Sequence, residues 1–196
     1  MTEDNQFITI VSGLPRSGTS LMMQMLVEGG IPALSDGIRQ HDIDNPAGYY
    51  EFERVKELPK GNIEWLNEAR GKVVKVISAL LPYLPSQYNY KVIFMRRHLA
   101  EVLESQRKML MRRGEDPNKI GDAQMTELFQ KHLQSVESWL ANQPNIDVLY
   151  VHYHELLQEP TLPVQTINQF LGNRLETSTM LQRIDQSLYR NRSAAG

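Results

Sequence analysis

The segment Gly13–Ser20 carries the residue types best suited to chemistry in this chain of 196 residues. Gly13 and Gly18 bound a short turn, with the spacing of loops whose backbone N–H groups surround a phosphate. Nucleotide-binding loops of this spacing carry a lysine where this chain has Thr19, and the nearest cation is Arg16, inside the turn. The pattern predicts a backbone cradle for a phosphate-like anion, with an arginine that supplies the positive charge.

A strand and a helix must hold this cradle, and the flanking sequence predicts both. Residues 6–11 are apolar and rich in β-branched side chains, which is typical of a buried strand. Apolar residues then recur at helical spacing from Leu21 to Leu26, until Gly29-Gly30 ends the helix. The N-terminus of this helix would add partial positive charge to the anion site.

The rest of the chain alternates strands with helices. Further strands are predicted over residues 72–77, 90–95 and 146–151. Helices are predicted over residues 51–58, 62–69, 99–112, 122–142, 163–171 and 176–189. Strands that are apolar almost throughout favour a parallel sheet with both faces covered, and such sheets bind ligands beyond the carboxyl ends of their strands. We therefore predict an α/β fold of three layers, P-loop NTPase-like, with a mostly parallel central sheet flanked by helices in a single domain over residues 1–196.

Composition narrows the class of function. The net charge of −2 gives no general attraction to nucleic acid, so we expect no nucleic-acid partner. The absence of cysteine excludes disulfides, thiolate metal sites and cysteine nucleophiles. No apolar run reaches 18 residues, and residues 1–6 are polar and acidic. We therefore expect neither a secretory signal nor a membrane span, and a cytoplasmic location.

The residues at the strand ends discriminate between kinds of phosphate chemistry. Kinases and NTPases use a lysine on the β/γ-phosphates and a strand-end Asp that helps to hold Mg²⁺. Here the strands lead into Ser78, Arg96-Arg97 and Tyr153, and none of them supplies an obvious Asp. Cations at this edge of the sheet favour a polyanion that is bound without a metal.

At these positions the chain resembles the sulfotransferases that use 3′-phosphoadenosine 5′-phosphosulfate (PAPS). Residues 13–20 are similar to their 5′-phosphosulfate loop, in the variant with arginine in place of lysine. A second family signature is a strand that ends in arginine, followed eight residues later by a helical serine, which Arg97 and Ser105 match. A third is Tyr-Glu-x-Leu-x-x-x-Pro, which residues 151–160 match with one extra residue after the tyrosine. The resemblance covers residues 7–172.

The resemblance implies an enzyme that moves a sulfuryl group in line from PAPS to a hydroxyl or amine acceptor. It would need no metal and would release adenosine 3′,5′-bisphosphate (PAP). The residues that would bind the co-substrate are Arg16, Ser17, Gly18, Thr19, Ser20, Arg97, Ser105 and Tyr153. Arg97 and Ser105 would hold the 3′-phosphate, with Arg96 as the alternative to Arg97. Only one of the two arginines can reach it directly, because neighbouring strand residues point to opposite faces. Tyr153 would contact the adenine.

Three residues are candidates for catalysis. Arg16 would neutralise charge on the sulfuryl and bridging oxygens as the S–O bond breaks. The family often has a lysine in the corresponding strand that contacts the transferring group, and Lys75 would take this role. The alternative is that the stem of Lys75 packs while its amine extends to water. Glu51 is the last residue of a segment that resembles the Asn-Pro-x-Gly-aromatic-aromatic-Glu segment of bacterial relatives. It would take the proton of the acceptor, with His41 and Asp42 as alternatives.

Two other functions stay open on the sequence: a small-molecule kinase that uses ATP and Mg²⁺, and a non-catalytic relative that keeps the nucleotide site. No metal site is predicted, because His152 and His154 have no third ligand nearby in the sequence. The partner would be a small molecule or another compound with a hydroxyl or amine group, and no membrane partner is expected. Residues 31–70 and the loops around 113–121 would shape its site.

Overall fold

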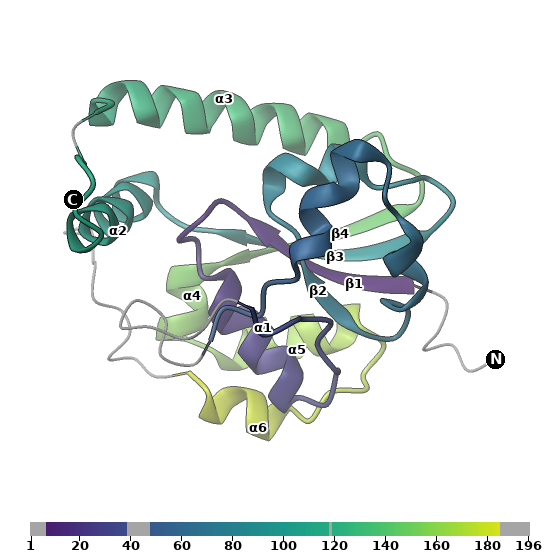
Figure 1. Ribbon diagram of the computed structural model, residues 1–196. Helices are drawn as coiled ribbons and strands as arrows, with labels where there is room; N and C mark the ends of the chain where they lie inside the picture. Colours follow the sequence, from purple (N-terminus) through teal and green to yellow (C-terminus); the bar gives the residue numbers. More distant parts are fainter. Residues whose placement is uncertain (1–6, 39–47, 118, 185–196) are drawn as a thin grey trace.

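The computed structural model describes residues 7–38, 48–117 and 119–184. A sheet of four strands, in the spatial order β2-β1-β3-β4, lies at its centre (Figure 1). The strands are β1 (Phe7–Gly13), β2 (Val73–Lys75), β3 (Asn89–Arg96) and β4 (Ile146–His152). Each pair of neighbours in this sheet is parallel. Within the residue ranges given above, no helix is long and apolar enough to cross a membrane.

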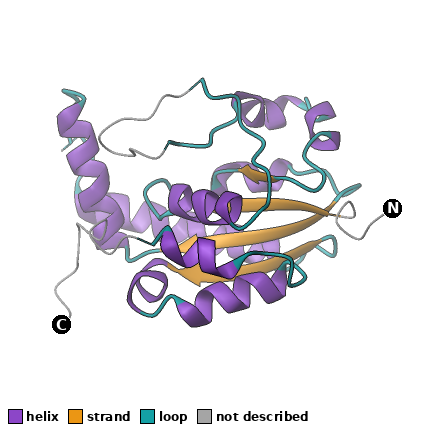
Figure 2. Ribbon diagram, turned by 90° about the horizontal axis from the view of Figure 1, so that it is seen from below, coloured by secondary structure: helices purple, strands orange, loops and turns teal. Residues whose placement is uncertain are grey.

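Successive side chains of a strand point to opposite faces, and β1 illustrates how this builds two hydrophobic cores. Ile10 packs into one core and Val11 into the other. The face of Val11 is covered by α1 (Thr19–Glu28), α4 (Tyr153–Gln158), α5 (Thr161–Phe170) and α6 (Thr177–Gln182). The face of Ile10 is covered by α3 (Asp122–Leu140) and by the 3₁₀ helices η2 (Glu53–Lys60), η3 (Glu64–Asn67) and η4 (Ser78–Tyr83). The strands thus lie between two helical layers (Figures 1 and 2), which confirms the predicted α/β fold.

Several elements differ from the prediction. The two helices expected between residues 51 and 69 are 3₁₀ helices, and Pro59 lies inside the first of them, where it removes a backbone donor. The short helices η4 and α4 were not predicted. β2 has three residues where six were expected, and within the sheet its neighbour is β1.

The apolar stripe of α3 is buried only at the C-terminal end of the helix. Val136 and Leu140 are buried, whereas the Leu128 residue is 48% exposed. α2 (Leu99–Arg112) packs against α3, and in Figure 1 the N-terminal half of α3 extends with α2 away from the sheet. The stripe therefore continues beyond the core, into a part of the molecule where Met125 and Phe129 border a cleft.

The parallel topology gathers the candidate residues at one edge. The loop 13–20 follows β1, Lys75 ends β2, and Arg97 follows β3. Tyr153 follows β4 as the first residue of α4. These are the carboxyl ends of parallel strands, so the fold brings four segments that are distant in the sequence to one edge of the sheet.

Candidate active site

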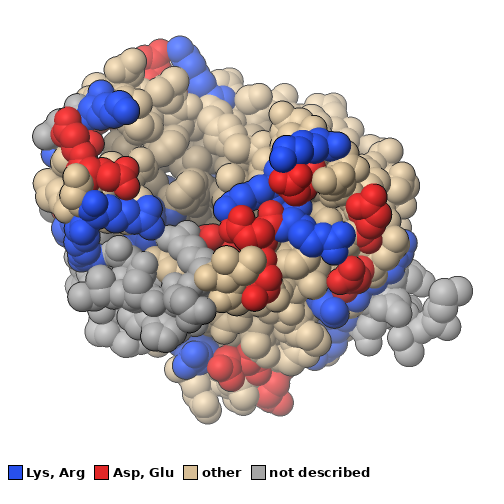
Figure 3. Space-filling view, in the orientation of Figure 1, with Lys and Arg blue, Asp and Glu red and all other residues tan. Residues whose placement is uncertain are grey.

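A cleft of about 1020 Å³ opens at this edge of the sheet. Its charged lining is one-sided: among the described residues, seven are basic and Glu51 is the one carboxylate. The basic residues are Arg16, Lys56, Lys75, Arg97, Lys108, Arg112 and Arg113. Figure 3 shows Lys and Arg side chains on both sides of a hollow in this face. The cleft concentrates positive charge although the chain has a net charge of −2, which suits an anionic ligand.

The loop between β1 and α1 forms the floor of the cleft and is closed by Ser17. The backbone N–H and the Oγ of Ser17 both donate to the carbonyl oxygen of Leu14, at 3.2 and 2.7 Å. A Cβ added to Gly13 would lie only 2.6 Å from the Oγ of Ser17, so the hydroxyl needs a glycine at this position. Ser17 therefore holds the loop together in this structure, and its contact with a ligand stays a prediction.

The helix behind the loop begins without a side-chain cap. Its N-cap is Gly18, with φ 100°, and this residue makes no side-chain cap hydrogen bond. The first N–H groups of an α-helix have no partner within the helix. Thr19 and Ser20, which open the helix, both line the cleft. The floor of the cleft thus combines backbone donors with the positive end of a helix dipole.

Arg97 is held at one end of the cleft by contacts on three sides. Its Nε donates to Oε2 of Glu101 at 2.9 Å, and its Nη1 donates to the carbonyl oxygen of Arg16 at 3.2 Å. Its guanidinium carbon lies 4.4 Å from the centre of the Tyr153 ring. The side chains of Arg97 and Glu101 are 8% and 2% exposed. Because the guanidinium is fixed before any ligand arrives, it is preorganised for a planar, bidentate anion contact.

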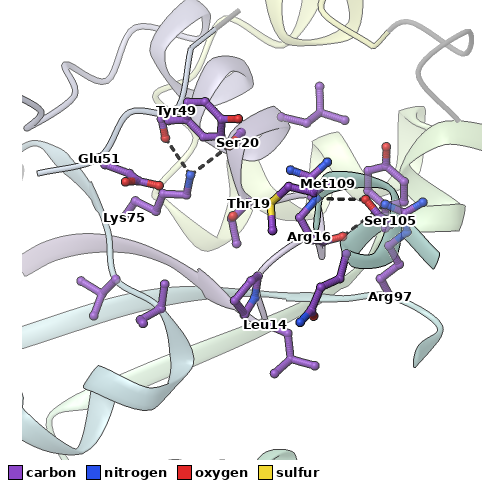
Figure 4. Close-up of a pocket in the computed structure, with 18 of the residues that line it drawn as sticks. Leu14, Arg16, Thr19, Ser20, Tyr49, Glu51, Lys75, Arg97, Ser105 and Met109 are labelled. Atoms are coloured by element: carbon purple, nitrogen blue, oxygen red, sulfur yellow. Dashed lines mark hydrogen bonds between the residues drawn. The ribbon is translucent and has the colours of Figure 1, made fainter. Parts of the chain in front are cut away.

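Arg16 is turned toward the same end. It lies in the left-handed region, with φ 69°, and its Nε donates to Oγ of Ser105 at 2.9 Å. Arg16, Arg97 and Ser105 lie together in Figure 4. The contact of Arg16 with a transferring sulfuryl group stays a prediction. In this structure the side chain of Arg16 is directed toward the hydroxyl of Ser105.

Arg96 points away from the cleft. Its Nη2 lies 2.7 Å from Oε1 of Glu137, and its guanidinium carbon lies 4.1 Å from the centre of the Tyr150 ring. Adjacent residues at the end of β3 project to opposite faces, so one arginine reaches the cleft while its neighbour packs under α3. Of the two arginines that the sequence left open, Arg97 is the one that lines the cleft.

Tyr153 supports the floor from below. It is 6% exposed and lies beneath Arg97 and against Gly18, so that a Cβ on Gly18 would come within 2.8 Å of its Cε2. Burial raises the pKa of the Tyr153 hydroxyl, and the charge of Glu101 adds to this, whereas Arg97 and Arg16 oppose it. The phenol therefore remains protonated near neutral pH. Its contact with an adenine stays a prediction, while its contacts with Arg97 and Gly18 are observed.

Lys75 and Glu51 lie at the other end of the loop, as Figure 4 shows. Nζ of Lys75 donates to Oγ of Ser20 at 2.9 Å and to the carbonyl oxygen of Tyr49 at 2.7 Å. The lysine thus bridges the end of β2, the start of α1 and the segment before η2. Glu51 lies just before η2, which begins at Glu53, so Glu51 is not part of that helix.

Some candidates lie outside the described residues. These are His41 and Asp42, the alternatives to Glu51. Within the described ranges, no group of three His, Asp or Glu side chains is placed to hold a metal ion. The rings of His152 and His154 lie 5.7 Å apart.

The comparisons with known proteins agree with this geometry. A family model described as a sulfotransferase domain matches residues 8–194. The chain belongs to the sulfotransferase domain family. No curated protein sequence matches it significantly. The solved structures similar to it include a sulfotransferase domain from the curacin biosynthetic pathway and the mouse sulfotransferase SULT7A1 complexed with PAP.

The likeness extends over nearly all of the chain. With the curacin-pathway domain the sequence identity is 17% and the TM-score 0.54, over 97% of this chain and 93% of the other. With the mouse protein they are 19% and 0.51, over 97% of this chain and 67% of the other. At these identities the likeness shows the fold, which is the P-loop NTPase-like fold of sulfotransferases.

Two contacts in this sulfotransferase were not foreseen from the sequence. Glu101 was not among the predicted site residues, yet its carboxylate fixes Arg97. Its position in the first turn of α2, four residues after Arg97, was the available signal. The second contact joins His132 to Ser78, which is buried: Nε2 of His132 shares a hydrogen bond of 2.8 Å with Oγ of Ser78. No local pattern predicts a contact between residues 54 positions apart.

Replacing Gly18 with alanine should destabilise the sulfotransferase by more than about 1–2 kcal/mol, the cost of the left-handed conformation alone. The added Cβ would also overlap the Tyr153 ring. Gly30 provides a matched control, since its φ of 104° is similar and no atom lies within 4 Å of a Cβ there. Urea denaturation should show a larger loss for Gly18→Ala than for Gly30→Ala. Equal losses would mean that the ring gives way.

The partly buried contact of His132 predicts a loss of stability in acid. Desolvation lowers the pKa of His132, so the folded protein takes up this proton less readily than the unfolded chain. The contribution to the free energy of unfolding is complete above the unfolded pKa of about 6.5 and decreases as the pH falls below it. Between pH 7.5 and 5.5 the melting temperature should fall more for the wild type than for His132→Gln. Parallel curves would contradict this.

Proposed function

We propose that this sulfotransferase transfers the sulfuryl group of PAPS to a hydroxyl or amine acceptor and releases PAP. One observation carries the proposal: a single cleft holds two separate groups of cations, Arg97 with Arg16 at one end of the loop and Lys75 at the other. PAPS carries two separate anionic groups, a 3′-phosphate and a 5′-phosphosulfate. The mouse sulfotransferase of similar fold, which was solved with PAP, supports the proposal.

In this proposal the end of the cleft with Arg97 binds the 3′-phosphate. Arg97, Arg16 and Ser105 together offer guanidinium and hydroxyl donors, and a phosphate dianion accepts several such bonds. Glu101 keeps Arg97 in place from behind. The 5′-phosphosulfate then lies over the start of α1, where the N–H groups of Thr19 and Ser20 and the ammonium of Lys75 meet.

The transfer itself needs an acceptor oxygen in line with the S–O bond that breaks. The acceptor oxygen bonds to sulfur, the bridging oxygen leaves with its electron pair on the phosphate of PAP, and Glu51 takes the hydroxyl proton. Negative charge grows on the bridging oxygen, and Lys75 would stabilise it. Ser20 and Tyr49 hold the lysine in this position, so little reorganisation is needed. A sulfuryl group carries less charge than a terminal phosphoryl group, so that protein cations suffice.

A thermal melt with PAP in EDTA tests the co-substrate directly. Saturation at about 100 times Kd should stabilise the protein by about 2.7 kcal/mol, which corresponds to about 5–10 °C for a domain of this size. ATP with Mg²⁺ should give a clearly smaller rise. Stabilisation by ATP with Mg²⁺ and none by PAP would instead indicate a kinase, and transfer of ³⁵S from PAPS to an acceptor would separate an enzyme from a non-catalytic relative.

A further inference from the structure

The part of the cleft beside Glu51 has apolar walls. Phe52 and Val55 come from the segment that enters η2, and Ile77 and Leu80 follow directly after Lys75. Met125 and Phe129 of α3 contribute further apolar side chains to the lining. Ser105, at the proposed nucleotide end, comes from α2 instead.

The hydrogen bond between Ser78 and His132 places the wall from α3 close to the reacting end. Ser78 is three residues after Lys75, and α3 packs against the helix η4 that Ser78 begins. Phe129 and His132 are three positions apart on α3, so they share one face of it. The face that the bond fixes over the end of β2 is therefore the face that carries Phe129.

The charge of the cleft limits the acceptor further. Glu51 is the single acidic side chain among the described lining residues, whereas seven are basic. An aliphatic amine is cationic at neutral pH and would be repelled, because its pKa is close to that of lysine. A sugar would leave most of its hydroxyl groups without partners against Phe52, Ile77 and Phe129, at a cost for each buried group.

We propose that the acceptor is a neutral or anionic alcohol or phenol with an apolar body, which packs between η2, η4 and α3 and presents one hydroxyl to Glu51. This narrows the proposed function, on which it rests, from hydroxyl or amine compounds to lipophilic hydroxyl compounds. Phe129 and its neighbours would select the acceptor by shape and apolar contact, and the cations would exclude amines.

Three acceptors of similar ring size test the proposal: cyclohexylmethanol, cyclohexylmethylamine and methyl glucoside. Calorimetry should show that cyclohexylmethanol binds the protein saturated with PAP at least tenfold more tightly than the other two. With PAPS, it should also give the highest kcat/KM for release of PAP. Phe129→Ala should raise its Kd roughly tenfold or more, since a large apolar contact is lost. Leu128→Ala is the matched control, because its side chain lies outside the cleft on the same helix, and it should leave Kd unchanged.

Preference for the glucoside or the amine, or an unchanged Kd in Phe129→Ala, would overturn the proposal. PAP binding is measured separately in the same protein, so the proposed function and the proposed acceptor class can fail independently. If PAP does not bind, the proposed function is wrong. Binding of cyclohexylmethanol to the free protein, and its weakening in Phe129→Ala, then still decide whether this cleft takes apolar alcohols.

Discussion

Replacing Glu51 with glutamine should lower kcat by about 10²–10⁴-fold, the usual contribution of a positioned general base. The amide keeps the size and shape of the side chain but cannot take the acceptor proton. Glu51 is the one carboxylate among the described residues that line the cleft, so no other acid seen there replaces it. Because the proposed 3′-phosphate contacts lie at the other end, the Kd of PAP should stay within about a factor of two. Stopped-time assays with PAPS and a hydroxyl acceptor, together with calorimetry of PAP, would measure both quantities.

Glu53→Gln is the control for this variant. Glu53 lies two residues further on, and its carboxylate accepts hydrogen bonds from Lys56 at 2.7 and 2.8 Å on an exposed part of η2. It does not line the cleft. Glu53→Gln should therefore keep the wild-type kcat. If Glu51→Gln also kept it, the base would have to be sought at His41 or Asp42.

Replacing Arg97 with alanine should weaken PAP binding by about 1.5–3 kcal/mol, the range for hydrogen bonds to charged groups. That corresponds to roughly 10–150-fold in Kd. The guanidinium is already oriented by Glu101, Arg16 and Tyr153, so its binding energy is not spent on ordering the side chain. The loss should be largest at low salt, since the interaction is electrostatic. Isothermal titration of PAP in EDTA would measure it.

Arg96 offers the closest possible control, because it is the adjacent arginine on the opposite face of β3. Its guanidinium is engaged with Glu137 and Tyr150 and does not reach the cleft. Arg96→Ala should leave the Kd of PAP nearly unchanged, although it removes the same charge from the same part of the chain. A weakening as large as that of Arg97→Ala would mean that net charge, rather than a direct contact, determines affinity.

The sequence was most informative where a local pattern determines the structure. The loop 13–20 combines its glycine spacing with an apolar strand before it and a periodic helix after it, and all three were read correctly. The helix 99–112 forms with the predicted bounds. From these local elements the parallel sheet followed, and with it the gathering of the loop 13–20, Arg97 and Tyr153 at one edge.

What the sequence could not show depends on contacts between distant segments. The direction of Arg16 is determined by Ser105, 89 positions away, and the anchoring of α3 by the bond between His132 and Ser78. The apolar stripe of α3 is a further case, because hydrophobic periodicity does not distinguish a side chain in the core from one that lines a cleft. For Phe129 that difference separates a structural role from a proposed role in acceptor binding.

A crystal structure of the protein soaked with PAP in EDTA tests the central claim, that one cleft grips both anionic ends of the nucleotide. The 3′-phosphate should lie within hydrogen-bond distance of Arg97 and Ser105, and the 5′-phosphate should lie over the backbone N–H groups of Thr19 and Ser20, near Lys75. A nucleotide bound elsewhere, or one whose 3′-phosphate faces solvent while Arg97 keeps its present contacts, would contradict the account.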